Sequence, residues 1–277
     1  MSDLRVVTLS ENTCVKRGLL AEHGLSLLID YKGYRLLFDT GQGPSVVANA
    51  RALSIDLKQL NAIALSHGHD DHTGGLLGVL RKTGPIDVYA HPEIFKEKYK
   101  SMAHNSYQCC GVPCSLNELT SAGARFKLNT KEVQPTPGLW LTGEIPRITE
   151  FEKTGERYFI EADEKYIPDT MLDDQALVAV TAKGPVVITG CAHAGLVNTL
   201  HHAAALTNSN HIYALVGGTH LHSASADKLA KTIDALKKFK VQKLAVNHCT
   251  GFKTQAELYR VFGDKLIINN TGDILEF

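Results

Sequence analysis

The sequence has no excess of charge of either sign. Its 29 basic residues balance 29 acidic ones, so the formal net charge is zero. Proteins that bind nucleic acid or a membrane surface usually carry an excess of positive charge, which this chain lacks. Lysine and arginine are also dispersed along the chain. We therefore expect a small-molecule substrate, and neither nucleic acid nor a membrane as a partner.

Cysteine and long apolar runs are also scarce. The six cysteines among 277 residues are too few and too unevenly spaced for a disulfide framework. No apolar run approaches the roughly 20 residues that span a bilayer, and the first residues contain no apolar segment typical of a secretory signal. We expect a cytoplasmic protein with reduced thiols. A homo-oligomer is compatible with this composition.

The glycine motifs that bind nucleotides are absent, because neither G-x-G-x-x-G nor a P-loop occurs. The composition is otherwise that of an ordinary globular protein, with 44% hydrophobic and 21% charged residues, which excludes disordered and fibrous classes. What the chain has in excess is histidine, with 13 residues. Histidine is the commonest metal ligand in proteins, so these residues are the first candidates for function.

Hydrophobic patterning predicts strands and helices in alternation. Strands are expected at 6–9, 26–31, 35–38, 62–65, 87–90, 176–181, 185–189, 212–216, 243–247 and 265–269, with weaker ones at 124–128 and 139–142. Helices are expected at 45–53, 76–81, 92–99, 195–206, 225–239 and 254–262. Lys32-Gly33 predicts a hairpin turn. Two β-rich halves with added helices indicate a layered architecture.

The most informative segment is a cluster of ligand-type side chains after the strand predicted at 62–65. His67, His69, Asp71 and His72 fall within six residues, and a Gly-Gly pair that opens a helix follows. In an extended loop, residues i and i+2 point the same way, so His67 and His69 can hold one metal ion. The following turn can bring Asp71 and His72 onto a second ion. Imidazole and carboxylate ligands suit zinc, iron and manganese.

This His-x-His-x-Asp-His motif resembles the metallo-β-lactamase-fold superfamily. Segments 36–41, 187–191 and 244–248 are similar to three further strands of that family, so the resemblance covers the whole chain. It implies an α+β fold, a four-layer αββα sandwich. We expect one domain over 1–277, with an irregular insertion at about 101–175, whose Pro- and Gly-rich stretch shows weak periodicity.

The resemblance also implies roles for residues outside the motif. Asp39 corresponds to an aspartate that orients a metal-binding histidine. Cys191 stands where the family usually has an aspartate that bridges two metals. His248 corresponds to the last histidine ligand. A divalent metal is therefore expected, in two ions, with zinc favoured and iron, manganese or magnesium as alternatives.

One family ligand is missing, because no histidine lies between Cys114 and Cys191. His193 is the best replacement, and Glu144 or Asp174 could also reach the site. His220 follows a Gly-Gly-Thr sequence that allows close approach to a ligand, as a metal ligand, a substrate contact or an exposed loop residue.

A narrower resemblance rests on short motifs spread over the chain. They are Glu22–Ser26, Thr142–Arg147, Asp174–Leu177, Gly190–Gly195, Gly217–Leu221 and Asn247–Gly251. Together they resemble a subgroup whose archaeal members are 7,8-dihydropterin-6-methyl-4-(β-D-ribofuranosyl)aminobenzene-5′-phosphate synthases. Bacterial relatives carry the same motifs without methanopterin biosynthesis, so the subgroup does not settle the reaction.

The function predicted from the sequence is a metal-dependent hydrolase that uses metal-activated water on a small, anionic substrate bearing phosphate or carboxylate. Asp71 would orient the nucleophile and His220 would assist catalysis. His23, Arg147 and His220 would bind the anionic group. The first alternative is a transferase that joins dihydropterin methyl pyrophosphate to ribofuranosylaminobenzene 5′-phosphate. A second alternative is a metal-sensing or redox protein centred on Cys191 and Cys249.

Overall fold

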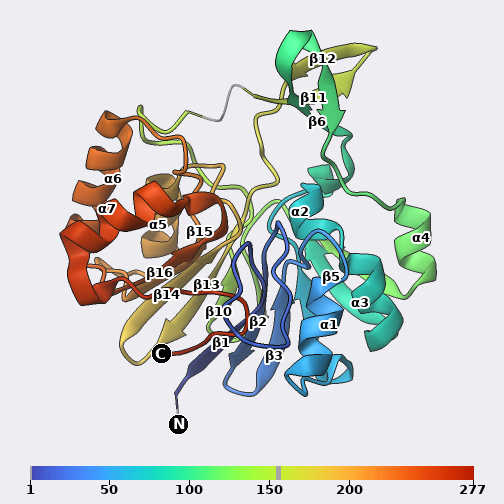
Figure 1. Ribbon diagram of the computed structural model, residues 1–277, viewed down its shortest axis with the longest axis horizontal. Helices are drawn as coiled ribbons and strands as arrows, with labels where there is room; N and C mark the ends of the chain where they lie inside the picture. Colours follow the sequence, from blue (N-terminus) through green and yellow to red (C-terminus); the bar gives the residue numbers. More distant parts are fainter. Residues whose placement is uncertain (1, 154–156) are drawn as a thin grey trace.

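The computed structural model describes residues 2–153 and 157–277. Two β-sheets pack face to face, and helices cover the outer face of each sheet (Figure 1). This is the four-layer αββα sandwich that the family resemblance implies. Within the described residues, no helix combines the length and the apolar character needed to cross a membrane.

The first sheet combines a meander with a parallel half. Its strand order is β17-β1-β2-β3-β4-β5-β8, antiparallel from β17 to β3 and parallel from β3 to β8. The strands are β1 (Leu4–Ser10), β2 (Ser26–Tyr31), β3 (Tyr34–Phe38), β4 (Ala62–Ala64), β5 (Ile86–Ala90), β8 (Ala124–Leu128) and β17 (Ile274–Glu276). The predicted hairpin is confirmed, because Lys32 and Gly33 both have positive φ, at 52° and 86°, as a two-residue turn requires.

The second sheet has the order β16-β15-β14-β13-β10-β9. Its strands are β9 (Val133–Thr136), β10 (Leu139–Leu141), β13 (Ala176–Thr181), β14 (Gly184–Thr189), β15 (Ala214–Gly218) and β16 (Lys243–Asn247). β14, β15 and β16 run parallel to one another. Their carboxyl ends therefore meet at one edge of the sheet, where a ligand site can form.

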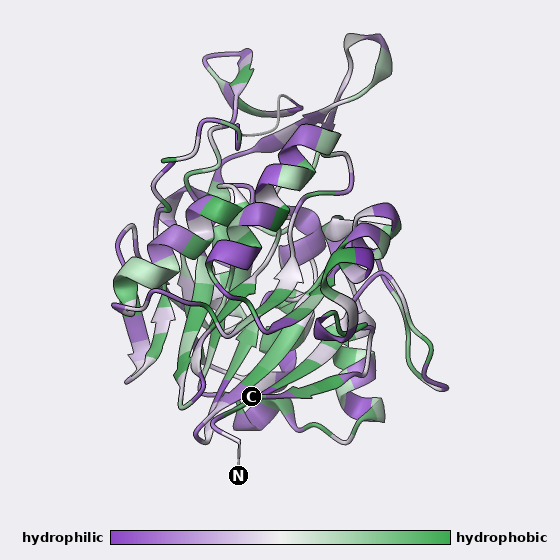
Figure 2. Ribbon diagram, turned by 90° about the vertical axis from the view of Figure 1, so that its left-hand side faces the viewer, coloured by the Kyte–Doolittle hydropathy of each residue, from purple (hydrophilic) through white to green (hydrophobic). Residues whose placement is uncertain are grey.

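Strand alternation divides the core into three layers. In β4, Ala62 and Ala64 face the other sheet, whereas Ile63 faces the helices α1 (Ser45–Ala52) and α3 (Leu76–Thr83). In β14, Val186 and Ile188 face the first sheet, whereas Val187 packs under the helices of the second half. Those helices are α5 (Leu196–Leu206), α6 (Ala226–Lys238) and α7 (Phe252–Phe262). Figure 2 shows the hydrophobic strands at the centre of the molecule.

A small third sheet projects beyond the sandwich (Figure 1). Its order is β12-β11-β6-β7, formed by β6 (Lys98–Ser101), β7 (Tyr107–Cys109), β11 (Tyr158–Ala162) and β12 (Lys165–Pro168). The segment 101–175, expected as one irregular insertion, is divided among all three sheets, since β8 joins the first and β9 and β10 join the second. Residues 154–156 of that segment lie outside the described residues.

Two predicted elements are wrong. The helix expected at 92–99 is a short 3-10 helix, Pro92–Phe95, and the chain then extends into β6 because Lys98 pairs with β11 of the third sheet. The strand expected at 265–269 is replaced by a 3-10 helix, Gly263–Lys265, and a single bridge from Leu266 to Leu244. The pattern also missed β17, a three-residue strand that alternates too briefly to be recognised.

Candidate metal centre

The candidate site lies where strands of both sheets end. Asp39 directly follows β3, and His220 and His248 follow β15 and β16 closely. All three have positive φ, at 59°, 49° and 51°, which is uncommon for residues other than glycine. The chain therefore turns sharply after each strand. These turns gather polar side chains at one edge of the sandwich.

The first ligand set consists of His67, His69 and His193. Their ring nitrogens lie within 4.8 Å of one another, and all three side chains are buried. Among the described residues, Nε2 of His69 and both ring nitrogens of His193 have no hydrogen-bond partner. Buried polar atoms are rarely left unpaired unless an ion or water satisfies them. This set therefore fits a metal ion.

The second ligand set consists of Asp71, His72 and His248. α2 (Asp70–Thr73) begins after His69 and presents the first two side chains. Asp71 Oδ2 lies 3.3 Å from His248 Nε2 and 3.8 Å from His72 Nε2. Asn12 Oδ1 accepts a hydrogen bond from His248 Nδ1 at 2.8 Å, which leaves Nε2 facing the carboxylate. One carboxylate and two imidazoles form a donor set suited to a divalent cation.

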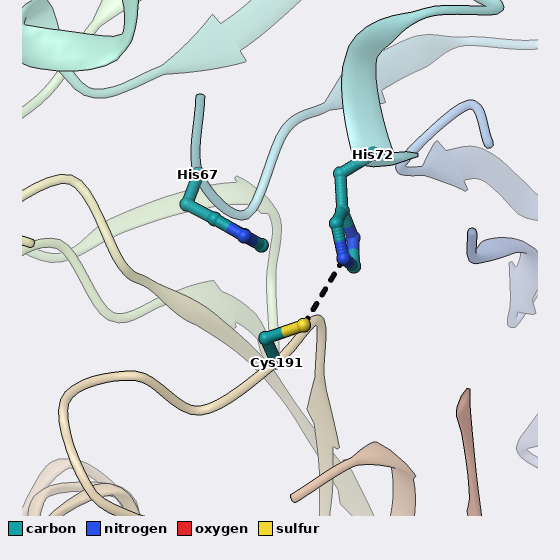
Figure 3. A group of neighbouring side chains, drawn as sticks. All are labelled: His67, His72 and Cys191. Atoms are coloured by element: carbon teal, nitrogen blue, oxygen red, sulfur yellow. Dashed lines mark hydrogen bonds between the residues drawn. The ribbon is translucent and has the colours of Figure 1, made fainter. Parts of the chain in front are cut away.

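Cys191 lies between the two sets. Its Sγ is 3.2 Å from His72 Nε2, and it forms one group with His67 and His72, whose side chains point toward it in Figure 3. It also groups with His193 and His220, and with His248 and Cys249. A thiolate here could reach an ion in either set. Cys249 is predicted to matter only in the redox alternative, although its position next to His248 is a signal that it lies close to the metal ligands.

Burial sets the charge of the first ligand set. It lowers the pKa of His69 to about 3 and holds the pKa values of His67 and His193 well below their usual range. These imidazoles are therefore neutral near pH 7, which is the form that binds metal.

The second set is charged. Burial lowers the pKa of His72, but the carboxylates of Asp71 and Asp39 outweigh burial and raise that pKa to about 9. Burial raises the pKa of Asp71, but His72 and His248 overcome this effect and hold it well below its usual value. Burial also raises the pKa of the Cys191 thiol. A metal ion entering this half must displace protons.

Asp39 supports histidines from both sets, one directly and one through Ser66. Its Oδ2 accepts a hydrogen bond from His72 Nδ1 at 2.7 Å. The same carboxylate accepts hydrogen bonds from the backbone N–H and the hydroxyl of Ser66, and Ser66 Oγ lies 2.8 Å from His67 Nδ1. Both rings therefore present Nε2 to the site.

A second support behind the site was not predicted from the sequence. Lys98 is almost fully buried, and its Nζ lies 2.7 Å from Asp169 Oδ2 and 2.9 Å from Asp173 Oδ1. The other oxygen of Asp173 accepts a hydrogen bond at 2.8 Å from the N–H of Gly68, the residue between His67 and His69. This ion-pair cluster therefore holds the loop that carries the first ligand set.

Substituting Lys98 with methionine is expected to destabilise the fold by about 3–5 kcal/mol, because it leaves two buried carboxylates without a counter-charge. Urea unfolding would measure this loss. The control is Lys96→Met, whose ion pair with Glu93 is partly exposed and contributes no more than about 1 kcal/mol. Equal losses in the two variants would contradict the role given to the buried cluster.

Of the predicted substrate-binding residues, two lie at the pocket and one does not. His220 lines the pocket of about 490 Å³ above the ligands, and its Nδ1 is buried without a partner among the described residues. His23 lies at the rim, with Nε2 3.4 Å from Asp71 Oδ2. Arg147 is not brought into the pocket, because its guanidinium donates to the carbonyls of His193, Thr170 and Met171.

The two alternatives to His193 also lie elsewhere. Glu144 pairs with His91 Nε2 at 3.2 Å and is half exposed. Asp174 Oδ2 accepts a hydrogen bond at 2.7 Å from the N–H of Ala194, so this carboxylate supports the loop that carries His193. Of the three candidates for the missing ligand, the structure brings only His193 against His67 and His69.

Comparison with known proteins identifies the family of this chain. Residues 20–248 match the family model of the metallo-beta-lactamase superfamily. Over 290 aligned residues the chain is 31% identical to a 7,8-dihydropterin-6-methyl-4-(beta-D-ribofuranosyl)-aminobenzene-5′-phosphate synthase of Methanocaldococcus jannaschii, covering 100% of this chain and 98% of that protein.

Among solved structures, Tm1679, described as a metal-dependent hydrolase of the beta-lactamase superfamily, has a TM-score of 0.86 and 30% identity over 99% of both chains. A ribonuclease Z of Treponema denticola is 40% identical, but only over 65 residues, which are 24% of this chain and 20% of that protein. By family match, full-length relative and fold, this chain belongs to the metallo-beta-lactamase superfamily.

Proposed function

We propose that this protein is a metal-dependent hydrolase that acts on a small anionic substrate. The observation that carries the proposal is the convergence of two ligand sets beneath one pocket, with Cys191 between them. Each set can hold one divalent ion. Imidazole and thiolate donors favour zinc over magnesium, whose preferred ligands are oxygens.

Bound at such a site, divalent ions lower the pKa of water and polarise the oxygen that receives charge. The residues of the chain position the reactants around them. Asp71, whose carboxylate stays ionised, can accept a hydrogen bond from the attacking water and orient it. His220, whose Nδ1 has no hydrogen-bond partner among the described residues, can contact the group that leaves. Burial of the histidines beneath the pocket limits the access of bulk water to the ligands.

A second function is favoured by one specific observation. The curated relative of 31% identity that aligns over the full chain is a synthase, whereas the ribonuclease Z relative aligns over only 65 residues. In a transferase, the same ligand sets would stabilise a pyrophosphate leaving group, and the pocket would exclude water in favour of a second substrate.

Two assays on the same metal-loaded protein separate these functions. A hydrolase should cleave phosphodiester or lactone substrates and should form no joined product from dihydropterin methyl pyrophosphate and ribofuranosylaminobenzene 5′-phosphate. A transferase should form the joined product, detected by mass spectrometry. Loss of the activity on metal removal, with recovery on zinc addition, is expected in both cases. Formation of the joined product without hydrolysis of the phosphodiester or lactone substrates would overturn the hydrolase proposal.

A further inference from the structure

A second cavity opens beside the pocket above the metal ligands. It has a volume of about 380 Å³ and lies among the start of α6, the loops after β14 and β15, and the third sheet. The two cavities share Lys100, Tyr158, His193, His220 and His222 in their walls. The two cavities are therefore adjacent, and we refer to them together as the groove, with the ligand sets under one end. We call the other end the basic pocket.

The basic pocket is lined by cations. Its wall contains four basic side chains, those of Lys100, Lys153, Arg157 and Lys228. Within residues 2–153 and 157–277, none of these four side chains forms an ion pair with a carboxylate. Their charges are therefore available to a ligand. In a chain whose net charge is zero, such a gathering is local and is not a consequence of composition.

The described part of the wall also contains one carboxylate, that of Glu152. Both of its oxygens accept hydrogen bonds from the backbone at the start of α5. Its Oε1 accepts a hydrogen bond from the N–H of Val197 at 2.8 Å, and its Oε2 accepts one from the N–H of Asn198 at 2.9 Å. The side chain is buried and caps the start of α5. Glu152 thus caps the helix, and the lysines and the arginine define the charge of the described part of the wall.

The third sheet fixes the cations relative to the metal ligands. Lys100 in β6 is the cross-strand partner of Tyr158 in β11, and the carbonyl of Arg157 accepts a hydrogen bond from the N–H of Ser101 at 2.8 Å. The ring of Tyr158 packs against His69, with 4.6 Å between the ring centroids. The same strand pair therefore contacts the first ligand set and carries Lys100, with Arg157 directly before β11, whereas Lys228 comes from the start of α6. The third sheet, which the sequence pattern did not predict, therefore forms one wall of the basic pocket.

We propose that the basic pocket binds a phosphate or diphosphate group of the substrate, separate from the bond that reacts at the metal ligands. A carboxylate would neutralise one cation, whereas a phosphate group carries up to two charges and three acceptor oxygens that can engage several donors at once. The arginine fork and the lysine ammonium groups are suited to phosphate oxygens. This inference rests on the proposed function only for the reaction, and not for the binding of phosphate.

Calorimetric titration of the metal-loaded protein with inorganic phosphate tests the binding directly. The triple variant K100Q/R157Q/K228Q is expected to lose one binding event that the unmodified protein shows, and R157Q alone should weaken that event about tenfold, which corresponds to one charge-assisted contact. Phosphate held by the metal ions is common to both proteins and cancels in the comparison. K237Q, at the other end of α6, is the control and should bind phosphate as the unmodified protein does. Unchanged binding in the triple variant would overturn the proposal.

A matched pair of substrates tests the position of the pocket during turnover. The pair is the 4-nitrophenyl ester of thymidine 5′-phosphate with a free or a phosphorylated 3′-hydroxyl. The triple variant should raise KM about tenfold or more for the phosphorylated ester and leave the other ester unchanged. Equal effects on both esters would contradict a separate phosphate site. If neither ester is hydrolysed, the hydrolase proposal fails for these substrates, whereas the calorimetric result still decides the basic pocket.

Discussion

Replacing both His67 and His69 with alanine is expected to remove metal from the first ligand set and to abolish metal-dependent turnover. The two side chains supply two of the three imidazoles of that set. Loss of a residue that merely orients a ligand typically costs about 10–100-fold in metal affinity or activity, so removal of two ligands should exceed that range. Elemental analysis of the purified variant and a hydrolysis assay would measure both effects.

The metal content of the same variant also shows how many ions the site holds. If each set holds one ion, the double variant should retain the ion held by Asp71, His72 and His248, and the metal content should fall from two per chain to one. If the site holds a single ion, the content should fall to zero. His201→Ala is the matched control, because this histidine packs against Phe239 on the outer helices and lies outside the ligand sets. Unchanged metal and activity in the double variant would contradict the assignment.

The main strands and the ligand motif could be predicted from the sequence because their signals are local, whereas the four-layer architecture follows from the family resemblance. β14 alternates between the two sides of its sheet, and the motif that begins at His67 places four ligand-type side chains within six residues. A period of two residues and a short spacing are visible without knowledge of the fold. His193 is the preferred replacement for a family ligand that the chain lacks, with Glu144 and Asp174 as alternatives, and the structure places it against His67 and His69.

The supporting contacts could not be predicted because they join distant parts of the chain. In the sequence, nothing distinguishes Lys98 from a surface lysine. Only the fold brings Asp169 and Asp173 next to it. The same cause explains the wrong helix at 92–99, since β6 exists through its pairing with β11 about 60 residues later. Arg147, expected to bind substrate, supports the loop of His193 through that residue's carbonyl instead.

Metal affinity is expected to rise steeply with pH, and the second ligand set determines this dependence. In the metal-free protein, the pKa of His72 is about 9 and burial raises the pKa of the Cys191 thiol, so both groups carry protons near pH 7. A metal ion binds the neutral imidazole and the thiolate, and therefore releases both protons. His69, with a pKa of about 3, releases none.

The sign and size of this effect follow from linkage. Each proton released makes the affinity rise about tenfold per pH unit as long as the pH stays below the pKa of the group that loses it. Two protons therefore give about 100-fold per unit near neutrality, and the contribution of His72 disappears as the pH rises through about 9. Calorimetry in buffers of different ionisation enthalpy would count the protons. About two should be released near pH 7, and about one fewer near pH 10.

Asp39→Asn provides the control that assigns one of these protons. The carboxylate of Asp39 is one of the two that raise the pKa of His72, and it accepts the hydrogen bond from His72 Nδ1 at 2.7 Å. Without that charge, His72 should lose its proton at lower pH and release less of it on metal binding near pH 8. The affinity itself should fall about 10–100-fold, because the ring is no longer oriented. An unchanged proton count in this variant would show that the released proton comes from a group other than His72.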